Sequence, residues 1–413
     1  METPYPPIHG GRVDIWRRLQ ALSKIGVEIQ LIFWHKGSFP TDDKEEILNI
    51  VDDLHILQMN GTTFISLMAR IASLPFYPLE VSSRLVYGPA FHRLLQSVKS
   101  FSPDAIMIDQ LHGCIAARKV HQQLHIPLIL RSHNIEHIYT KNLLKTAQGF
   151  RKILRLLSLN GLKRVEQATI NDSLAFYDIS VDDLSYWKSL GFNHGYFLPP
   201  LTALSDHASK LSGIFDPPTP EVPGESSELD HCDYDVVFLG NLNTDNNVAG
   251  VSWFLLDVVP ILHKERPNLK VLIAGSNPVD RISKVCHSIP CVTLIANPKS
   301  AADVYRSGQV LINPNSVGGG VSMKAIDMLA AGRPIVTLPS GIGGLPAEAR
   351  QLFHVASNAN DFAAKILLCL DKKSIELHDQ ELIDKLFGMA AIQAFVEDLK
   401  FRISSNGSQI NES

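Results

Sequence analysis

The sequence predicts an α/β protein with two doubly wound domains, each a parallel sheet covered by helices. Short apolar runs alternate with longer amphipathic ones, a pattern typical of repeated strand–helix–strand units. Several short runs are apolar throughout, as in strands whose sheet is covered on both faces. A stretch rich in Pro, Ser, Asp and Glu, centred on DPPTPEVPGESSELD, divides the series in two and indicates a linker.

Each half of the chain has its own series of expected strands. They lie at 27–34, 54–59, 104–109, 127–134 and 176–181, and then at 234–240, 269–275, 292–296, 309–315 and 333–338. We therefore expect an N-terminal domain at 1–198, a linker at 199–233, a C-terminal domain at 234–373, a C-terminal helix at 374–403 that crosses back to the first domain, and a disordered tail at 404–413. Only Met-Glu-Thr precedes Pro4, where a strand–loop–helix unit needs an apolar strand, so the first domain is expected to lack its first strand.

Composition excludes several classes of protein. The 413 residues are 45% hydrophobic and 19% charged, as in an ordinary globular protein. The 38 Lys and Arg residues against 42 Asp and Glu give a net charge of −4, which argues against nucleic acid as a partner. No run approaches the roughly 18–20 apolar residues that span a membrane. Five scattered cysteines and an N-terminus without signal-peptide features favour the cytoplasm.

The segment QVLINPNSVGGGVSMKAIDMLAAGRPIVTL (309–338) carries the main candidate site and reads as strand, glycine turn, helix and strand. Gly318, Gly319 and Gly320 allow a close backbone approach. A helix that begins near Val321 points unpaired N–H groups at this turn, which favours a diphosphate there.

Two side chains of the expected helix extend this site. Lys324 can add a full positive charge to a leaving phosphate, and Asp327 follows at i+3, where it can accept hydrogen bonds from ribose hydroxyls. The alternative is a tight structural turn beside a solvated lysine. The spacing matches neither G-x-G-x-x-G nor a phosphate loop that ends in G-K-[ST], so dinucleotide and ATPase interpretations are weak.

Several segments, in order along the chain, resemble those of one enzyme family. They are PYPPIHGGR (4–12), RSHNIEH (131–137), FLGNLNTDNNVAGVSWFLLDVVP (238–260), GGGVSMKAIDMLAAGRPIV (318–336) and SGIGGL (340–345). Over nearly its whole length the chain resembles family 4 of the retaining, two-domain (GT-B) glycosyltransferases. The resemblance implies two Rossmann-like domains that face each other across a cleft.

The resemblance also implies a reaction and its residues. A sugar would move from a nucleoside-diphosphate sugar, the co-substrate, to the hydroxyl of a glycan, a lipid-linked molecule or a small molecule. The configuration would be retained, without metal or cofactor. By this resemblance, His133 and Lys324 would be catalytic, and Gly10 and Gly11 would contact the donor phosphates or the acceptor. Gly240, Asn241 and Lys324 would contact the diphosphate. Asp327 would contact the ribose.

Departures from the family pattern support a second hypothesis. Gly319 and Asp327 stand where many members have two glutamates, and Ser322 stands where one subgroup has an arginine. These changes remove a carboxylate from the donor sugar and a positive charge from the phosphates. The alternative is therefore a degenerate member that binds a nucleotide sugar or a glycan without turnover.

A third hypothesis comes from His133–His137, which match H-x-x-E-H, the inverted zinc-peptidase motif. Such a site needs both histidines one turn apart on a helix and a third ligand. Here the motif directly follows an expected strand, so a zinc hydrolase is the weakest of the three hypotheses.

One further segment suggests a membrane partner. Residues 141–164 contain seven basic and no acidic residues, with apolar residues at helical spacing. This segment either contacts an anionic membrane peripherally, on the inner face, or packs on its domain as an ordinary helix. The apolar run at 63–79 is either an acceptor-side wall or core.

Overall fold

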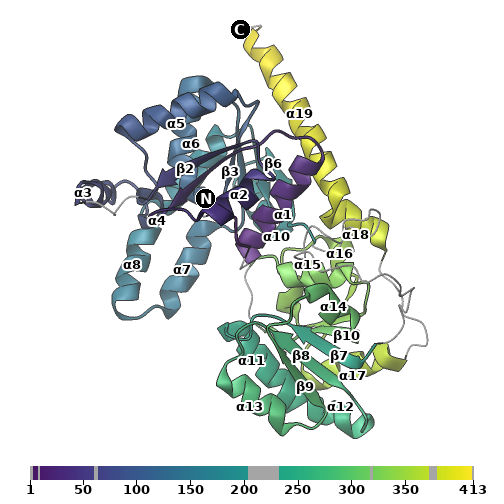
Figure 1. The fold of residues 1–413 in the computed structure, drawn as a ribbon. Helices are drawn as coiled ribbons and strands as arrows, with labels where there is room; N and C mark the ends of the chain where they lie inside the picture. Colours follow the sequence, from purple (N-terminus) through teal and green to yellow (C-terminus); the bar gives the residue numbers. More distant parts are fainter. Residues whose placement is uncertain are drawn as a thin grey trace. The chain divides into compact units, whose positions relative to one another are not determined.

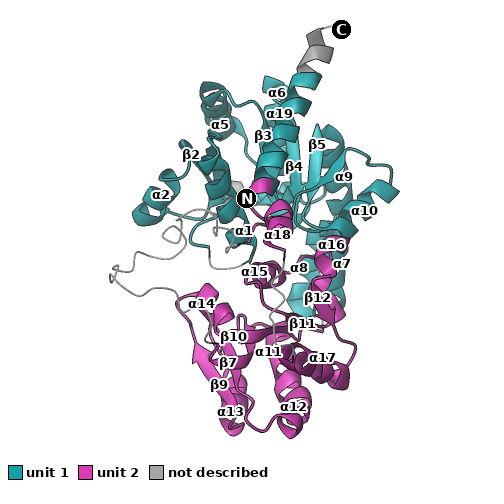
Figure 2. Ribbon diagram, turned by 90° about the vertical axis from the view of Figure 1, so that its right-hand side faces the viewer, with its two compact units in different colours: residues 1–200, 391–413 teal, residues 201–390 magenta. Residues whose placement is uncertain are grey.

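The structure is a computed structural model that describes residues 3–7, 10–59, 64–202, 232–316, 320–371 and 379–411. The chain forms two compact units: residues 1–200 with 391–413, and residues 201–390 (Figure 2). Both units are built from parallel strands and helices, which confirms the predicted α/β class (Figure 1).

The first unit contains two separate parallel sheets. One pairs β1 (Gln30–His35) with β2 (Asp53–Gln58), and the other has the order β3 (Ile106–Asp109), β4 (Leu128–Ser132), β5 (Ala175–Asp178) and β6 (Gly195–Phe197). No described strand joins β1 to β3, and the missing first strand stays a prediction. The three-residue β6 was not expected from the sequence.

Helices connect these strands. They are α1 (Gly10–Lys24), α2 (Thr41–Leu48), α3 (Phe64–Ser73), α4 (Leu79–Ser82), α5 (Gly88–Phe101), the 3₁₀ turn η1 (Leu111–Gly113), α6 (Cys114–Leu124), α7 (Glu136–Thr146), α8 (Gly149–Leu159), α9 (Leu162–Asp172) and α10 (Val181–Ser189). In α1, Ile15, Trp16 and Leu19 recur at helical spacing and are buried in one cluster with Phe33 of β1.

The basic segment 141–164 is not one helix. It spans the end of α7, all of α8 and the start of α9. The breaks coincide with Gly149 and Gly161, whose φ values of 54° and 67° lie in the left-handed region that favours glycine. The helical spacing predicted from Leu143 to Leu157 therefore does not continue along a single helix.

The second unit has one six-stranded parallel sheet. Its order is β12 (Phe353–Val355), β11 (Ile335–Thr337), β10 (Gly308–Asn313), β7 (Tyr234–Leu239), β8 (Val271–Gly275) and β9 (Val292–Ala296). The short β12 was not expected. Successive strand residues face opposite sides of the sheet. Val236 and Phe238 enter one buried cluster, whereas Val237 enters the other.

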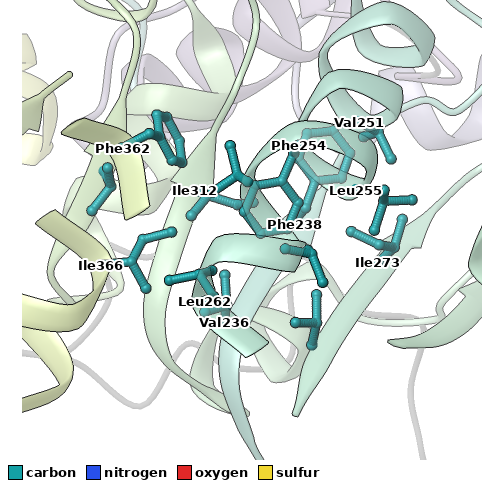
Figure 3. Packing of buried hydrophobic residues seen from close by; sticks show 14 of the residues in the cluster. Val236, Phe238, Val251, Phe254, Leu255, Leu262, Ile273, Ile312, Phe362 and Ile366 are labelled. Carbon is teal, nitrogen blue, oxygen red and sulfur yellow. The ribbon is translucent and has the colours of Figure 1, made fainter. Parts of the chain in front are cut away.

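Helices cover both faces of this sheet. They are α11 (Asp245–Trp253), the π-helical η3 (Phe254–Val258), α12 (Val259–Glu265), α13 (Asp280–Ser288), α14 (Ala301–Arg306), α15 (Met323–Ala330), the 3₁₀ turn η4 (Pro339–Ile342), α16 (Ala347–Arg350), α17 (Ala359–Asp371) and α18 (Gln380–Phe387). Figure 3 shows the cluster that forms on one face, where Phe254 and Phe362 pack beside Phe238 and Ile312. Residues of α15 and α18 pack on the other face.

The C-terminal segment forms two helices instead of the single one expected at 374–403. Between α18 and α19 (Met389–Asn411) lies Gly388, where a Cβ atom would come within 2.0 Å of the Asp384 carboxylate. In the first unit, Tyr177 donates a hydrogen bond to Asp398 of α19 at 2.9 Å, and Arg402 donates one to the Tyr196 hydroxyl at 2.7 Å. The helix continues to Asn411, into the segment predicted as a tail.

We expect the second unit to depend on Phe254, which is 0% exposed. Truncation of this ring in the Phe254→Ala variant leaves a cavity and lowers the free energy of unfolding by about 3–5 kcal/mol. Leu256→Ala, in the same turn but at a side chain 56% exposed, changes it by less than about 0.5 kcal/mol. Denaturant unfolding measures both, and equal losses in the two variants would contradict this packing.

Candidate functional site

The candidate site of the second unit lies at the carboxyl edge of its sheet. Because parallel strands end at the same edge, the loops that follow them meet there. Gly240 and Asn241 directly follow β7, and the loop after β10 leads to the first turn of α15, which carries Lys324. The structure thus brings together two segments that the sequence predicted as diphosphate contacts.

Asn247 connects three loops of this edge through its side-chain amide. Its Nδ2 donates a hydrogen bond to the Asn241 carbonyl at 2.9 Å. Its Oδ1 accepts one from Asn315 Nδ2 at 2.9 Å and lies 3.4 Å from Lys324 Nζ. The Ser340 hydroxyl donates to the Asn315 carbonyl, which adds the loop after β11. The loop positions are therefore fixed by side chains before any ligand binds.

Gly240 packs closely against the end of the neighbouring strand β8. A Cβ atom on Gly275, the last residue of β8, would come within 1.8 Å of the Gly240 carbonyl oxygen. A Cβ atom on Gly240 itself would lie 3.0 Å from the Phe238 ring and 3.1 Å from Asn247. Glycine at these two positions allows the backbones to approach each other.

Lys324 is a partly buried cation without an anionic partner in the described part of the chain. Its Nζ lies 4.4 Å from the centroid of the Phe238 ring, and among the described residues no carboxylate pairs with it. Loss of hydration lowers the pKa of Lys324 to about 7. A bound anion would favour the protonated form and raise this pKa again.

The helix after the glycine turn begins later than predicted. α15 starts at Met323 because the Ser322 hydroxyl accepts a hydrogen bond from the Ala325 N–H at 3.3 Å and so forms the N-cap. Gly320 has a φ of 70°, a conformation that favours glycine. Gly318 and Gly319 lie outside the described residues. Asp327 lies one turn beyond Met323, and its ribose contact stays a prediction.

In the first unit, His133 belongs to a buried network of charges. It follows β4, and its Nε2 lies 2.7 Å from Asp109 Oδ1 at the end of β3. Arg131 donates to Asp14 Oδ2 at 2.6 Å, and Arg18 pairs with both Asp14 and Asp109. All five side chains are buried, so the two aspartates and two arginines compensate each other away from water.

This environment keeps His133 neutral. Burial, followed by the positive charge of Arg131, lowers the pKa of His133 to about 3. Burial alone would raise the pKa of Asp14, but Arg131 and Arg18 outweigh it and hold that pKa well below its usual value. Nε2 lies 2.7 Å from Asp109 Oδ1 and 3.0 Å from Arg131 Nη1. With the proton on Nε2 and directed to the nearer carboxylate, a neutral imidazole has Nδ1 as an acceptor. His133 can therefore accept a hydrogen bond from a hydroxyl group, but it is a poor acid.

Gly10 and Gly11 form the first two positions of α1, the helix that carries Asp14 and Arg18. The network therefore joins the start of α1 to the loop that holds His133. Contact of these glycines with donor phosphates or acceptor stays a prediction.

The zinc-peptidase motif does not adopt the arrangement that it needs. α7 begins at Glu136, so His133 lies outside the helix. Both ring nitrogens of His137 have other partners: Nδ1 lies 2.6 Å from Glu166 Oε2, and Nε2 lies 3.1 Å from the Tyr186 hydroxyl. The two histidines therefore face separate carboxylates, Asp109 and Glu166, and do not converge on one point.

Several residues of both sites were not singled out from the sequence. They are Asn247, Asn315, Ser340, Asp14, Arg18, Asp109 and Arg131. Asp109 and Arg131 had a detectable signal, because each is a charged residue at the carboxyl end of an otherwise apolar strand. Asn247 had none, since nothing in its local sequence distinguishes it from the neighbouring polar residues.

Comparisons with known proteins give a family match to the segment that holds the candidate site of the second unit. Residues 233–372 match the family model described as "Glycosyl transferases group 1". A Klebsiella pneumoniae protein named "Uncharacterized 44.6 kDa protein in cps region" is 28% identical over 380 residues, which is 89% of this chain and 88% of that protein.

The solved structures that resemble the chain establish its GT-B fold. One is the Anabaena protein HepE in complex with UDP and glucose, with a TM-score of 0.61, 10% identity, and coverage of 97% of this chain and 98% of that chain. Another is sucrose-phosphate synthase from Thermosynechococcus elongatus, with a TM-score of 0.59, 14% identity, and coverage of 96% and 94%.

We expect the network around His133 to be essential for the stability of the first unit. The Asp14→Asn variant leaves two buried guanidinium groups with a single carboxylate and lowers the free energy of unfolding by about 3–5 kcal/mol. Glu45→Gln, the same type of change at an exposed position of α2, alters it by less than about 0.5 kcal/mol. Urea unfolding compares them, and an Asp14→Asn protein as stable as Glu45→Gln would contradict the network.

Proposed function

We propose that the chain is a glycosyltransferase that moves a sugar from a nucleoside-diphosphate sugar to an acceptor hydroxyl. The match of residues 233–372 to group 1 glycosyl transferases and the GT-B fold support glycosyl transfer. The observation that carries the donor site is Lys324. It is a desolvated lysine in the first turn of α15, without a carboxylate partner among the described residues, at the edge where parallel sheets bind ligands.

The diphosphate is the leaving group, and its growing negative charge is what the site would stabilise. In the first turn of α15, the Ala325 N–H is capped by Ser322, while the N–H groups of Met323 and Lys324 have no partner inside the helix and lie at the positive end of the helix dipole. Lys324 adds a charge-assisted hydrogen bond. Because these groups are fixed before reaction, they would favour the transition state over the bound donor. We propose that this suffices without a metal ion or a cofactor.

Retention of configuration is part of the proposal and rests on the resemblance to glycosyltransferase family 4. We assign no carboxylate nucleophile. His133 is the proposed sugar-contacting residue. As a neutral imidazole with Nδ1 as the acceptor, it would bind a hydroxyl group and position it rather than transfer a proton.

The acceptor is proposed to be the hydroxyl of a glycan or of a lipid-linked molecule, and the location to be the cytoplasm. All five cysteines are free in the structure. Such thiols fit a reducing compartment.

The affinity for UDP tests the donor site, and UDP is the first ligand to try because HepE was solved with it. We expect Lys324→Met, which keeps an unbranched side chain one atom shorter and removes the charge, to weaken UDP binding about 10–100-fold in titration calorimetry. Lys299→Met, at an exposed loop position of the same unit, should bind like the wild type. A Lys324→Met protein with unchanged affinity, or a wild type that binds none of UDP, GDP and ADP, would contradict the assignment.

The pKa of Lys324 predicts a pH dependence with a defined sign. The free protein loses the Lys324 proton above about pH 7, whereas bound diphosphate holds it, so UDP binding takes up a proton above this pH. Affinity should fall by up to about tenfold per pH unit above pH 7, where the phosphate itself, with a pKa of about 6, is already ionised. Lys324→Met should show no such slope. A wild-type profile as flat as that of the variant would show that Lys324 does not titrate on binding.

A further inference from the structure

Helix α3 exposes the side chains that a domain helix normally buries. Phe64, Leu67, Met68 and Ile71 recur at i, i+3, i+4 and i+7, the apolar stripe of an amphipathic helix. Their side chains are 78%, 42%, 50% and 51% exposed. The stripe therefore points away from the core of its own unit.

Helix α8 also exposes large apolar side chains. Phe150, Ile153 and Leu156 are 71%, 54% and 51% exposed. The buried residue of this helix is polar: Ser158, whose hydroxyl donates a hydrogen bond to Glu80 Oε1 at 2.6 Å. Leu154, Leu157 and Leu159 are only partly buried, so the packing of α8 leaves its largest apolar side chain, Phe150, exposed.

The two helices meet where the chain leaves each of them. After α8, Asn160 donates a hydrogen bond to the carbonyl of Leu74, just beyond α3, at 2.7 Å. The next residue, Gly161, approaches the carbonyl of Phe76 so closely that a Cβ atom there would lie 3.3 Å away. We call the exposed apolar side chains of α3, α8 and the turn between α3 and α4 the α3–α8 surface; they are Phe64, Leu67, Met68, Ile71, Phe76, Phe150, Ile153 and Leu156.

Exposed hydrophobic side chains are concentrated in the α3–α8 surface, which holds half of the large ones that are exposed among the described residues. Scattered exposed hydrophobic residues need no explanation, but a cluster on adjoining elements marks a binding surface.

The segment that contains α8 is positively charged, although the whole chain has a net charge of −4. Residues 141–164 contribute Lys141, Lys145, Arg151, Lys152, Arg155, Lys163 and Arg164 and no acidic residue. At helical spacing, Arg151, Lys152 and Arg155 form the polar face of α8 and Phe150 and Ile153 its apolar face, the pattern of a helix that lies in a membrane interface. The complementary partner is therefore both apolar and anionic.

We propose that the α3–α8 surface binds the surface of a bilayer that contains anionic phospholipid. The apolar side chains would enter the boundary between headgroups and acyl chains, while the basic ones contact the phosphates. No helix in the described part of the chain is long and apolar enough to cross a membrane. A second copy of the chain fits less well, because it would bring like charges face to face.

The inference is independent of the donor site, since the surface belongs to the first unit and Lys324 to the second. It bears on the proposed function in one respect. An enzyme held at a bilayer meets a lipid-linked acceptor at high local concentration, so the proposed choice of acceptor narrows to that class.

Sedimentation of the full chain with vesicles tests the proposal. We expect the wild type to bind phosphatidylglycerol vesicles at least about tenfold more tightly than phosphatidylcholine vesicles. Phe150→Ser should weaken binding to the anionic vesicles about tenfold or more. Phe401→Ser, in α19, is the matched control, because the two phenylalanines are 71% and 70% exposed. The control variant should bind like the wild type.

A charge reversal tests the proposed contact between the basic side chains and the lipid phosphates. Lys152→Glu should weaken binding to phosphatidylglycerol vesicles about tenfold, and added salt should reduce the difference from the wild type. Lys299→Glu, an exposed lysine of the second unit, should leave binding unchanged.

Three results would overturn the proposal: no binding of the wild type to anionic vesicles, equal binding of Phe150→Ser and Phe401→Ser, or a wild-type dimer that Phe150→Ser dissociates without any vesicle binding. UDP affinity, measured on the same samples, should be equal in all these variants. Loss of UDP binding in the wild type would count against the donor site and leave the membrane result unaffected.

Discussion

An ammonium group that lacks a carboxylate partner in the described structure is the constraint on which the donor site depends. Burial beside Phe238 removes water from Lys324, and the ring face and the Asn247 amide compensate only part of that loss. A folded protein would ordinarily satisfy such a group with an aspartate or a glutamate. Here the described neighbouring side chains are the Phe238 ring and the Asn247 amide, which is why we propose that the negative charge of a ligand completes the site.

The first unit handles buried charge in the opposite way. Asp14, Arg18, Asp109 and Arg131 neutralise one another, and the network needs no ligand to be complete. Its effect is positional, since Asp109 and Arg131 both contact Nε2 of His133 and hold the ring, while burial keeps it neutral. The two units thus differ: the second contains Lys324, which has no carboxylate partner among the described residues, and the first fixes the orientation of the His133 ring.

The sequence predicted most of the sheet framework and the local part of the donor site. Each expected strand overlaps an observed one, because strands of a covered parallel sheet are short, mostly apolar runs. β6 and β12 were not predicted, because a strand of three residues is too short to give a recognisable apolar run. The glycine turn and Lys324 were visible as a local pattern. Asn247 and Asn315 were not, since their contact joins residues 68 positions apart and exists only in the folded chain.

Two differences concern helix ends. Ser322 looked like the loss of a positive charge, but the structure gives it a role as the N-cap of α15. The sequence predicted one basic helix in the segment 141–164, yet its glycines divide the segment, and Phe150, Ile153 and Leu156 of α8 are exposed. Helical spacing predicts that a helix has two faces. It does not predict which face the rest of the chain covers.

Donor turnover is the most direct test of the central claim that a sugar leaves a diphosphate held at Lys324. We would incubate the protein with UDP-, GDP- and ADP-sugars in the presence of EDTA and follow the released sugar by proton NMR. The account predicts that one donor releases its sugar with the configuration retained, and that Lys324→Met slows this release about 100-fold or more. A donor that binds at Lys324 without any turnover, with or without acceptors, would indicate a non-catalytic binding protein. Release with inverted configuration, or at an unchanged rate in Lys324→Met, would contradict the account.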